Sequence, residues 1–206
     1  MKKPQSGRGP RGFTLIEMLV VLAILMILLL FAVPALQTAM RQGKLRGMAN
    51  ETATVMRLAR LTAIKNSCTS IVKIVIDSSP RVEGFPDCDG NGVLDADKKT
   101  LGSFPLPYGV HFLAPPNLQG NASIDRLSVD PAGGAANVAI FQPDGSVRDR
   151  ETGAFRFGDD NGNFLEVRIA PPATARIEVR KCLLCTADDS SDWYANGDNG
   201  KSWVWK

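Results

Sequence analysis

Acidic and amide side chains gather in one short stretch, at the spacing of a cation-binding loop. Oxygen ligands occupy its first, third, fifth and ninth positions, glycine is sixth, and a further acid is eleventh; these side chains are Asp87, Asp89, Asn91, Asp95 and Asp97. Ca²⁺ prefers such oxygen ligands, and loops of the EF-hand type use this spacing. The twelfth position is Lys98 instead of a bidentate acid, however, and Asn91-Gly92 is also an ordinary turn signal. The stretch therefore predicts either a calcium site or a turn-rich surface loop.

The cysteines offer a second kind of chemistry, and there are four of them: Cys68, Cys88, Cys182 and Cys185. An even number of cysteines in an exported domain usually means disulfides, and four cysteines allow three pairings. We expect Cys182 to pair with Cys185, which leaves Cys68 and Cys88 to tie a helix end to the acidic stretch. A redox site or half of a zinc site at Cys182 and Cys185 is the alternative. Zinc is disfavoured because a second thiol pair is missing and the single histidine, His111, has no thiol pair beside it; we expect His111 to pack in a strand.

The sequence shows no arrangement of residues that indicates catalysis. We find no nucleophile placed with a base, no paired carboxylates in a pocket context and no phosphate-binding loop. We therefore predict that the chain is not an enzyme and that it needs no cofactor other than the calcium considered above.

The elements that position these side chains begin with an apolar run from Phe13 to Leu36, in which Glu17 is the only ionisable residue. A helical run of this length can cross a hydrocarbon core of about 30 Å. A lone carboxylate inside such a segment is costly unless it has a partner, so we expect Glu17 to be functional. Pro34 lies near the end of the run, where it predicts a kink in the helix or the point of exit from the membrane.

The residues ahead of the apolar run are basic. Positions 1–12 contain Lys2, Lys3, Arg8 and Arg11 and no acid, and without them the chain has 20 basic and 21 acidic residues, a net charge of −1. Positive charge ahead of a membrane segment holds that end in the cytoplasm. We therefore expect a single-pass protein of the bacterial inner membrane, with its N-terminus cytoplasmic and its soluble part periplasmic.

After the apolar run the pattern becomes an amphipathic helix over 37–66 and then a β-rich domain over 67–206. Short apolar runs separated by turn residues predict an antiparallel sheet, with strands at Ser70–Asp77, Tyr108–Leu113, Asn137–Phe141, Ser146–Arg148, Ala154–Phe157, Asn163–Ala170 and Thr174–Lys181. We expect tight connections at Asp160-Asn161-Gly162 and around Pro171-Pro172. The C-terminal tail is rich in aromatic residues, which either anchor a partner subunit or cover the domain's own sheet.

The N-terminal string from Gly12 through Phe13, Thr14 and Glu17 to Leu25 resembles the class III signal of type IV pilins and type II secretion pseudopilins. This resemblance implies a prepilin peptidase that cleaves between Gly12 and Phe13, N-methylation of Phe13, and pairing of Glu17 with the N-terminal amine of a neighbouring subunit. It also implies the α+β type IV pilin fold, in which a long N-terminal helix, half transmembrane and half amphipathic, packs on an antiparallel β-sheet domain. Positions 1–12 would then be the leader peptide and 13–36 the transmembrane and filament-core helix.

Two further stretches are similar to the GspH/FimT group of minor pilins and pseudopilins: the helix end Met56–Lys65 and the turn Ile140–Ser146. The likeness implies a minor type IV pilin that takes part in priming assembly at or near the pilus tip. Its partners would be other major and minor pilins and the inner-membrane assembly platform, and its final location the pilus on the cell surface. A GspH-like pseudopilin of a periplasmic pseudopilus is the alternative.

Some pilins of this group bind DNA, which makes the basic residues Arg176, Arg180 and Lys181 candidates for a DNA-binding surface. Phosphate contacts dominate the affinity of DNA-binding proteins, which normally present a basic face. Here the acids Glu166 and Glu178 interleave with the arginines, and the Gly-Arg-x-Arg element of the DNA-binding members is absent. A DNA-binding minor pilin is therefore the second alternative.

Overall fold

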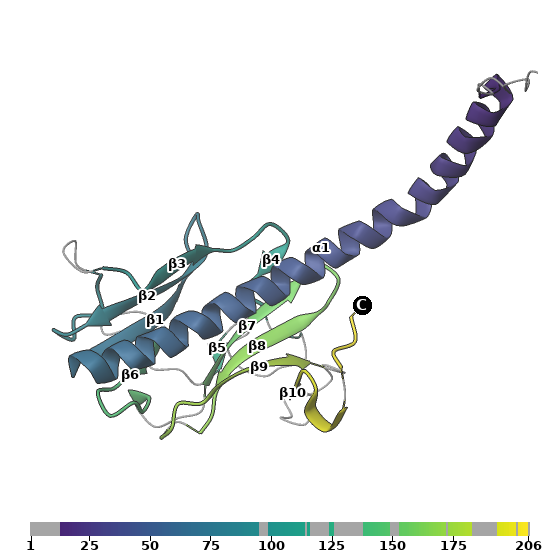
Figure 1. Ribbon diagram of the computed structural model, residues 1–206. Helices are drawn as coiled ribbons and strands as arrows, with labels where there is room; N and C mark the ends of the chain where they lie inside the picture. Colours follow the sequence, from purple (N-terminus) through teal and green to yellow (C-terminus); the bar gives the residue numbers. More distant parts are fainter. Residues whose placement is uncertain are drawn as a thin grey trace, which may run out of the picture. The chain divides into compact units, whose positions relative to one another are not determined.

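The computed structural model describes residues 13–94, 99–113, 115, 124–125, 138–148, 153–171, 173–182, 193–200 and 202–205. The chain divides into two compact units, Met1–Met40 and Arg41–Lys206. One helix, α1 (Leu15–Asn66), begins in the first unit and ends in the second, and it carries Pro34 in its interior without ending there. Figure 1 shows α1 and the strands of the second unit.

In the first unit, α1 begins at a side-chain cap. The Glu17 amide donates a hydrogen bond to Thr14 Oγ1 at 3.3 Å, and the Met18 amide donates to the Thr14 carbonyl at 3.3 Å. Threonine followed three residues later by glutamate is the spacing of a capping box, which satisfies amides that the first helical turn leaves without partners. All residues from Phe13 to Arg41 are exposed, although most are apolar. Among the described residues, α1 is the one helix that is long and apolar enough to cross a membrane.

In the second unit, one stripe of α1 is buried, as the predicted amphipathic pattern requires. Its members recur mostly at steps of three and four residues. They are Leu45, Met48, Ala49, Thr52, Ala53, Val55, Met56, Ala59 and Ala63, and the last two are alanines. Alanines let the helix backbone approach the sheets closely. Burial begins at Leu45, so the first residues of the predicted amphipathic segment remain exposed.

The end of α1 has the hydrogen bonds of a Schellman motif. The Cys68 amide donates to the Ala63 carbonyl at 3.3 Å, and the Ser67 amide donates to the Ile64 carbonyl at 3.4 Å. Ser67 takes the left-handed conformation, with φ at 53°, at the position where glycine is usual. This turn sends the chain from the helix directly into the first strand.

The strands form two antiparallel sheets. In the four-stranded sheet the order is β3-β2-β1-β6, with β1 at Thr69–Val75, β2 at Arg81–Asp87, β3 at Gly102–Pro105 and β6 at Val138–Phe141. The six-stranded sheet has the order β10-β9-β8-β7-β4, with β5 paired to β7; its strands are β4 at Val110–His111, β5 at Ile124–Asp125, β7 at Gly153–Asp159, β8 at Phe164–Ile169, β9 at Ile177–Cys182 and β10 at Trp193–Ala195. A short 3-10 helix, η3, covers Asp198–Gly200.

The buried stripe of α1 and the inner faces of both sheets make one hydrophobic core, which includes Met56 from the helix, Val72 from β1 and Phe155 from β7. Figure 1 shows the second half of α1 lying across the strands. Val55 occupies the closest contact, because a Cβ atom at Gly84 would lie 2.3 Å from its Cγ1 atom and one at Gly102 would lie 2.9 Å from its Cγ2 atom. The predicted α+β architecture, a long helix packed on antiparallel sheets, is confirmed.

Several local predictions differ from the structure. The strand Ser146–Arg148 is reduced to one isolated bridge between Phe141 and Val147, and Tyr108–Leu113 is shortened to β4. Strand β2 was not predicted because it contains Gly84 and Pro86, both of which are rare inside strands. The expectation that His111 packs in a strand is wrong: it lies in β4, but its side chain is 57% exposed and its Nε2 atom lies 3.1 Å from Asp160 Oδ1.

Both predicted hairpins are present. The turn between β7 and β8 places Gly162 at φ 75° and joins the Gly162 amide to the Asp159 carbonyl at 3.1 Å. Strands β8 and β9 pair through a connection in which the Thr174 amide donates to the Pro171 carbonyl at 3.3 Å.

Candidate functional site

The N-terminal candidates lie around the first turn of α1. Phe13 precedes the helix and is 74% exposed, and Gly12 lies outside the described residues. Glu17 is exposed in the first helical turn, where a negative charge is favoured by the helix dipole. Within the described part of the chain, its carboxylate makes no hydrogen bond or ion pair. The local structure thus uses the backbone of Glu17 for the cap and leaves its side chain available to an outside cation.

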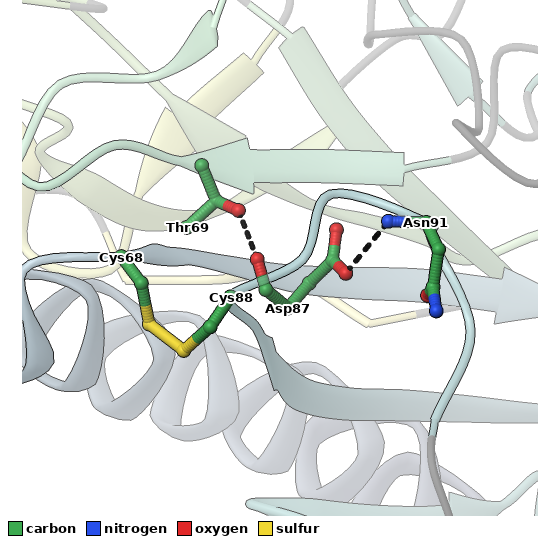
Figure 2. Close-up of a disulfide and its surroundings, with 5 residues drawn as sticks. All are labelled: Cys68, Thr69, Asp87, Cys88 and Asn91. Carbon is green, nitrogen blue, oxygen red and sulfur yellow. Dashed lines mark hydrogen bonds between the residues drawn. A yellow bond between two sulfur atoms is a disulfide. The ribbon is translucent and has the colours of Figure 1, made fainter.

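The acidic loop begins where β2 ends, and its first carboxylate is buried. Asp87 is 1% exposed, and its Oδ1 atom accepts a hydrogen bond from the Asn91 amide at 3.1 Å. Thr69 Oγ1 donates to the Asp87 carbonyl, which fixes the strand end (Figure 2). The other carboxylate oxygen, Oδ2, is buried without a hydrogen-bond partner among the described residues. An unpaired carboxylate oxygen in this position is costly unless a cation or a proton compensates it.

The rest of the described loop is held by short-range hydrogen bonds. Asn91 Nδ2 donates to Asp89 Oδ2 at 2.7 Å, and the Val93 amide donates to Asn91 Oδ1 at 2.7 Å. Lys73 Nζ donates to the Gly92 carbonyl at 3.3 Å. These are the bonds of an Asx-rich turn, so the loop as described satisfies the turn prediction.

The environment of Asp87 shifts its protonation. Burial raises the pKa of the Asp87 carboxyl above its ordinary value, and the neighbouring Asp89 carboxylate raises it further. The amides of Gly92 and Asn91 oppose this rise, but they do not cancel it. The folded protein therefore disfavours the charged form of Asp87.

A disulfide joins Cys68 to Cys88, with their Cα atoms 4.9 Å apart and a sequence separation of 20. It ties the end of α1 to the residue that follows Asp87, as Figure 2 shows. Cys182 is also disulfide-bonded. Its predicted partner, Cys185, lies outside the described residues.

The complete calcium-ligand set is not brought together within the described residues. Asp95 and Asp97 lie outside them, and no group of three or more His, Cys, Asp or Glu side chains suited to a metal occurs in the part of the chain that is described. Asp87, Asp89 and Asn91 do lie close together at the start of the loop, in the geometry given above.

The three candidate DNA-binding residues do not form one surface. Arg176 is exposed and pairs with Glu178 at 2.8 Å. Arg180 is held by Glu166, with its Nε atom 2.9 Å from Oε1. Neighbouring residues of a strand point to opposite faces, so Lys181 turns away from Arg180; it is 3% exposed, with Nζ 5.1 Å from the Trp205 ring.

Glu166 is a centre of charge that sequence reasoning missed. It is fully buried in β8 and forms ion pairs with three arginines. Arg156 Nε lies 3.3 Å from Glu166 Oε2, Arg168 Nη1 lies 3.8 Å from Oε1, and Arg180 also pairs with Oε1. Cross-strand register explains the cluster, because Arg156 and Arg180 are the residues paired with Glu166 on the two neighbouring strands. The sequence does show arginines and glutamates within β7, β8 and β9. Which of them face one another can be known only from the pairing register of the strands.

The two stretches that are similar to the GspH/FimT group meet in space. Arg60, from the helix end, donates from Nε to the Gly145 carbonyl in the turn at 2.9 Å. Gly145 has φ at 81°, and a Cβ atom there would lie 3.0 Å from Ile64 Cδ1. Arg57, one turn earlier, donates to the Ile177 carbonyl in β9 at 3.2 Å. The helix end is thus joined by arginine-to-carbonyl hydrogen bonds to the turn that follows β6 and to β9.

Residues 7–33 match the family model of the prokaryotic N-terminal methylation motif. The match spans the end of the basic leader and most of the apolar run, including Gly12, Phe13 and Glu17. The N-terminal segment therefore carries this methylation motif.

Two solved structures are similar to this chain, and both are crystal structures of the type IV minor pilin FimU from Pseudomonas aeruginosa strain PAO1. The crystal form in space group P21 has 14% sequence identity and a TM-score of 0.43, over 74% of this chain and 94% of FimU. The form in space group P65 has 14% identity and a TM-score of 0.41, over 73% of this chain and 97% of that one. A comparison with curated proteins finds no match.

Proposed function

We propose that this chain is a minor pilin of a type IV pilus, a structural subunit that takes part in priming assembly at or near the pilus tip. The observation that carries the proposal is the methylation motif at residues 7–33, of which 15–33 lie on α1. The apolar first half of this helix is exposed, and its second half packs on the sheets of the β-rich unit. A helix of this kind has two uses in succession, first as a membrane anchor and then as part of a filament core.

Maturation follows from the motif. Prepilin peptidase removes positions 1–12 by cleavage after Gly12, and Phe13 becomes the methylated N-terminus. Glu17 then pairs with the N-terminal amine of a neighbouring pilin, because a cation from a second chain neutralises a carboxylate in an apolar setting. Its exposed carboxylate, which has no partner among the described residues, supports this role. Pro34 removes one backbone hydrogen bond from the helix and lets it adjust when it packs in the filament.

The partners and the location follow from the same proposal. The chain waits in the bacterial inner membrane with its N-terminus in the cytoplasm and residues 67–206 in the periplasm. The assembly platform then moves it into a filament of major and minor pilins. The amphipathic segment over 37–66 supports side-to-side contacts, while the β-rich unit gives them specificity.

A gene deletion separates this proposal from the pseudopilin alternative. Loss of surface pili and of twitching, restored by the wild-type gene, is the outcome expected for a minor pilin. Normal pili together with loss of exoprotein secretion would assign the chain to a type II secretion pseudopilus instead. For the DNA-binding alternative, the chain should bind duplex DNA with a steep salt dependence, and Arg176 is the candidate side chain that is most accessible for it.

We also propose that the acidic loop binds Ca²⁺ as a structural ion. The support is the buried Asp87 oxygen that has no partner among the described residues, next to Asp89 and Asn91. Ca²⁺ should raise the melting temperature of the chain, and a chelator should lower it, whereas Asp87→Asn should abolish both effects. An equal melting temperature with Ca²⁺ and with chelator would leave the loop as a plain turn.

A further inference from the structure

Two cation–aromatic pairs flank α1 at the start of the second unit. Lys44 Nζ lies 6.0 Å from the centroid of the Tyr108 ring, and Arg46 Cζ lies 5.0 Å from that of Trp203. Leu45, between the two cations, is fully buried, so Lys44 and Arg46 lie on opposite flanks of the helix. Both cations are exposed, and Tyr108 is 92% exposed. The Tyr108 ring is therefore open to contact from outside the protein.

The C-terminal segment is fixed in place beside Arg46. Trp203 donates from its indole nitrogen to the Tyr194 carbonyl at 3.2 Å and from its amide to Asn196 Oδ1 at 3.1 Å. Trp205 packs edge-on against Trp203, with the ring centroids 6.1 Å apart, and Val204 between them is 66% exposed. The aromatic tail therefore partly covers the protein's own core and partly presents an apolar ridge to the outside.

A groove with polar and basic walls opens beside this ridge. Its volume is about 600 Å³, and Arg46, Arg57, Asn50, Asn196 and Trp203 line it together with Val179 and Ala195. None of these lining residues is acidic. An acid lies beside the lining residues, because Asp198 Oδ2 accepts a hydrogen bond from the Ala195 amide at 3.0 Å. The groove thus presents two guanidinium groups and amide donors, which suit a phosphate group.

The position of these residues in the sequence indicates what they meet. Lys44 and Arg46 follow Leu36, the end of the apolar run, by eight and ten residues. In helical conformation this is about 12 and 15 Å. The interfacial layer of a bilayer extends about 5–8 Å beyond the hydrocarbon core, and long basic side chains reach several ångströms toward it.

We propose that Lys44, Arg46, Tyr108, Trp203 and Trp205 form an aromatic–basic collar that binds anionic phospholipid headgroups. Tryptophan and tyrosine favour the membrane interface, and lysine and arginine attract anionic lipids. The collar holds the β-rich unit against the membrane surface before assembly and releases it when the helix leaves the bilayer. The inference rests on the proposed membrane anchorage of residues 13–36.

Tryptophan fluorescence can measure contact of the collar with the membrane. The chain has three tryptophans, Trp193, Trp203 and Trp205, and none lies in helix α1. The full chain is reconstituted into vesicles that contain phosphatidylglycerol and lipids with a nitroxide either at the headgroup or deep in the acyl chain. We expect the headgroup nitroxide to quench tryptophan fluorescence more strongly than the deep one. Quenching should fall in vesicles of phosphatidylcholine alone and in 1 M salt, where the Debye length is about 3 Å.

A pair of matched variants tests the role of charge. Lys44→Gln with Arg46→Gln should lower the equilibrium constant for headgroup contact by about fivefold per cation, or on the order of 25-fold for both. Lys65→Gln with Lys99→Gln removes the same charge from exposed positions outside the collar and should leave quenching unchanged. Equal quenching in the two double variants, or quenching that grows with the protein-to-lipid ratio as contact with a second copy would require, would overturn the inference.

A separate readout distinguishes failure of the anchor from failure of the collar. Resistance of the chain to carbonate extraction reports insertion of α1 independently of the tryptophans. A chain that resists extraction but shows no headgroup quenching refutes the collar alone. A chain that is extracted refutes the membrane anchorage on which both proposals rest.

Discussion

Asp87 shows how a single side chain links the fold to a measurable property. Its carboxylate is buried at the end of β2, beside the disulfide and in contact with a second acid. For an acid whose pKa is raised on folding, the unfolded chain ionises first as pH rises. The free energy of unfolding therefore falls between the unfolded pKa, about 3.9, and the higher folded pKa, and is constant above that.

Asp87→Asn should remove this fall in stability. Urea unfolding of the chain in detergent, measured from pH 3 to pH 7 in chelator, should show that the free energy of unfolding of the variant, relative to wild type, rises with pH. Asp77→Asn is the matched control, because Arg81 lowers the pKa of Asp77 and that residue contributes stability above its unfolded pKa, which is lost as pH falls. A free energy of unfolding that, relative to wild type, stays constant or falls with pH in Asp87→Asn would contradict the burial argument.

Some contacts between residues could be predicted from the sequence, and others could not. The Cys68–Cys88 pair could be expected as one of the three pairings that four cysteines allow, the one that remains if Cys182 pairs with Cys185. The face of β9 on which Arg180 and Lys181 lie could not be predicted, because a shift of one residue in strand register exchanges the two faces of the strand. For the same reason the contacts of Glu166 with three arginines emerged only from the register.

At the scale of elements, the contact of α1 with β2 and β3 depends on two residues without side chains. Val55 fits against Gly84 and Gly102, where a Cβ atom would lie under 3 Å from its methyl groups. This contact also explains why β2 contains a glycine that sequence patterns read as a strand breaker. The loss in strand propensity is offset by close packing of helix on sheet, which no local pattern reveals.

Gly84→Ala should destabilise the chain by about 1–3 kcal/mol through overpacking. For a unit of this size, each kcal/mol lowers the melting temperature by about 2–4 °C. Val55→Ala in the same chain should relieve part of the clash, so that the double variant is more stable than the sum of the single effects. Gly43→Ala, where a Cβ atom meets nothing within 4 Å, is the control and should not destabilise; a similar loss there would show that the packing argument is wrong.

Ser67→Gly should stabilise the junction between α1 and β1. Ser67 has a φ of 53° at the end of the helix, a conformation that costs residues other than glycine about 1–2 kcal/mol. Because glycine also loses more backbone entropy on folding, we expect a net gain of up to about 1 kcal/mol in thermal unfolding. Ser78→Gly, at an exposed position without a positive φ, should give no gain; a lower melting temperature for Ser67→Gly would contradict the Schellman assignment.

At the scale of the whole molecule, the N-terminal half of α1 was the most predictable part, since an apolar run and a specific motif both lie in the sequence itself. The arrangement of the β-rich unit was predictable in class but not in strand order. Pairings such as β1 with β6 join residues about 70 positions apart in the chain, beyond the range of local signals.

Glu17→Leu should leave membrane insertion intact but remove the chain from filaments. An apolar side chain suits the lipid better than a carboxylate, while the pairing with a neighbour's N-terminal amine is lost. Ile16→Leu changes the neighbouring residue without altering charge and should assemble normally. Fractionation into membrane and sheared pili measures both properties; a Glu17→Leu chain that is recovered from pili at the wild-type level would refute the pairing role.

The most direct test of the minor-pilin proposal is mass spectrometry of the chain's N-terminus in sheared, purified pili. The proposal predicts a mature chain that begins with N-methylated Phe13, present in the pilus fraction in far smaller amount than the major pilin. A chain found only in the membrane fraction, still carrying positions 1–12, would contradict it.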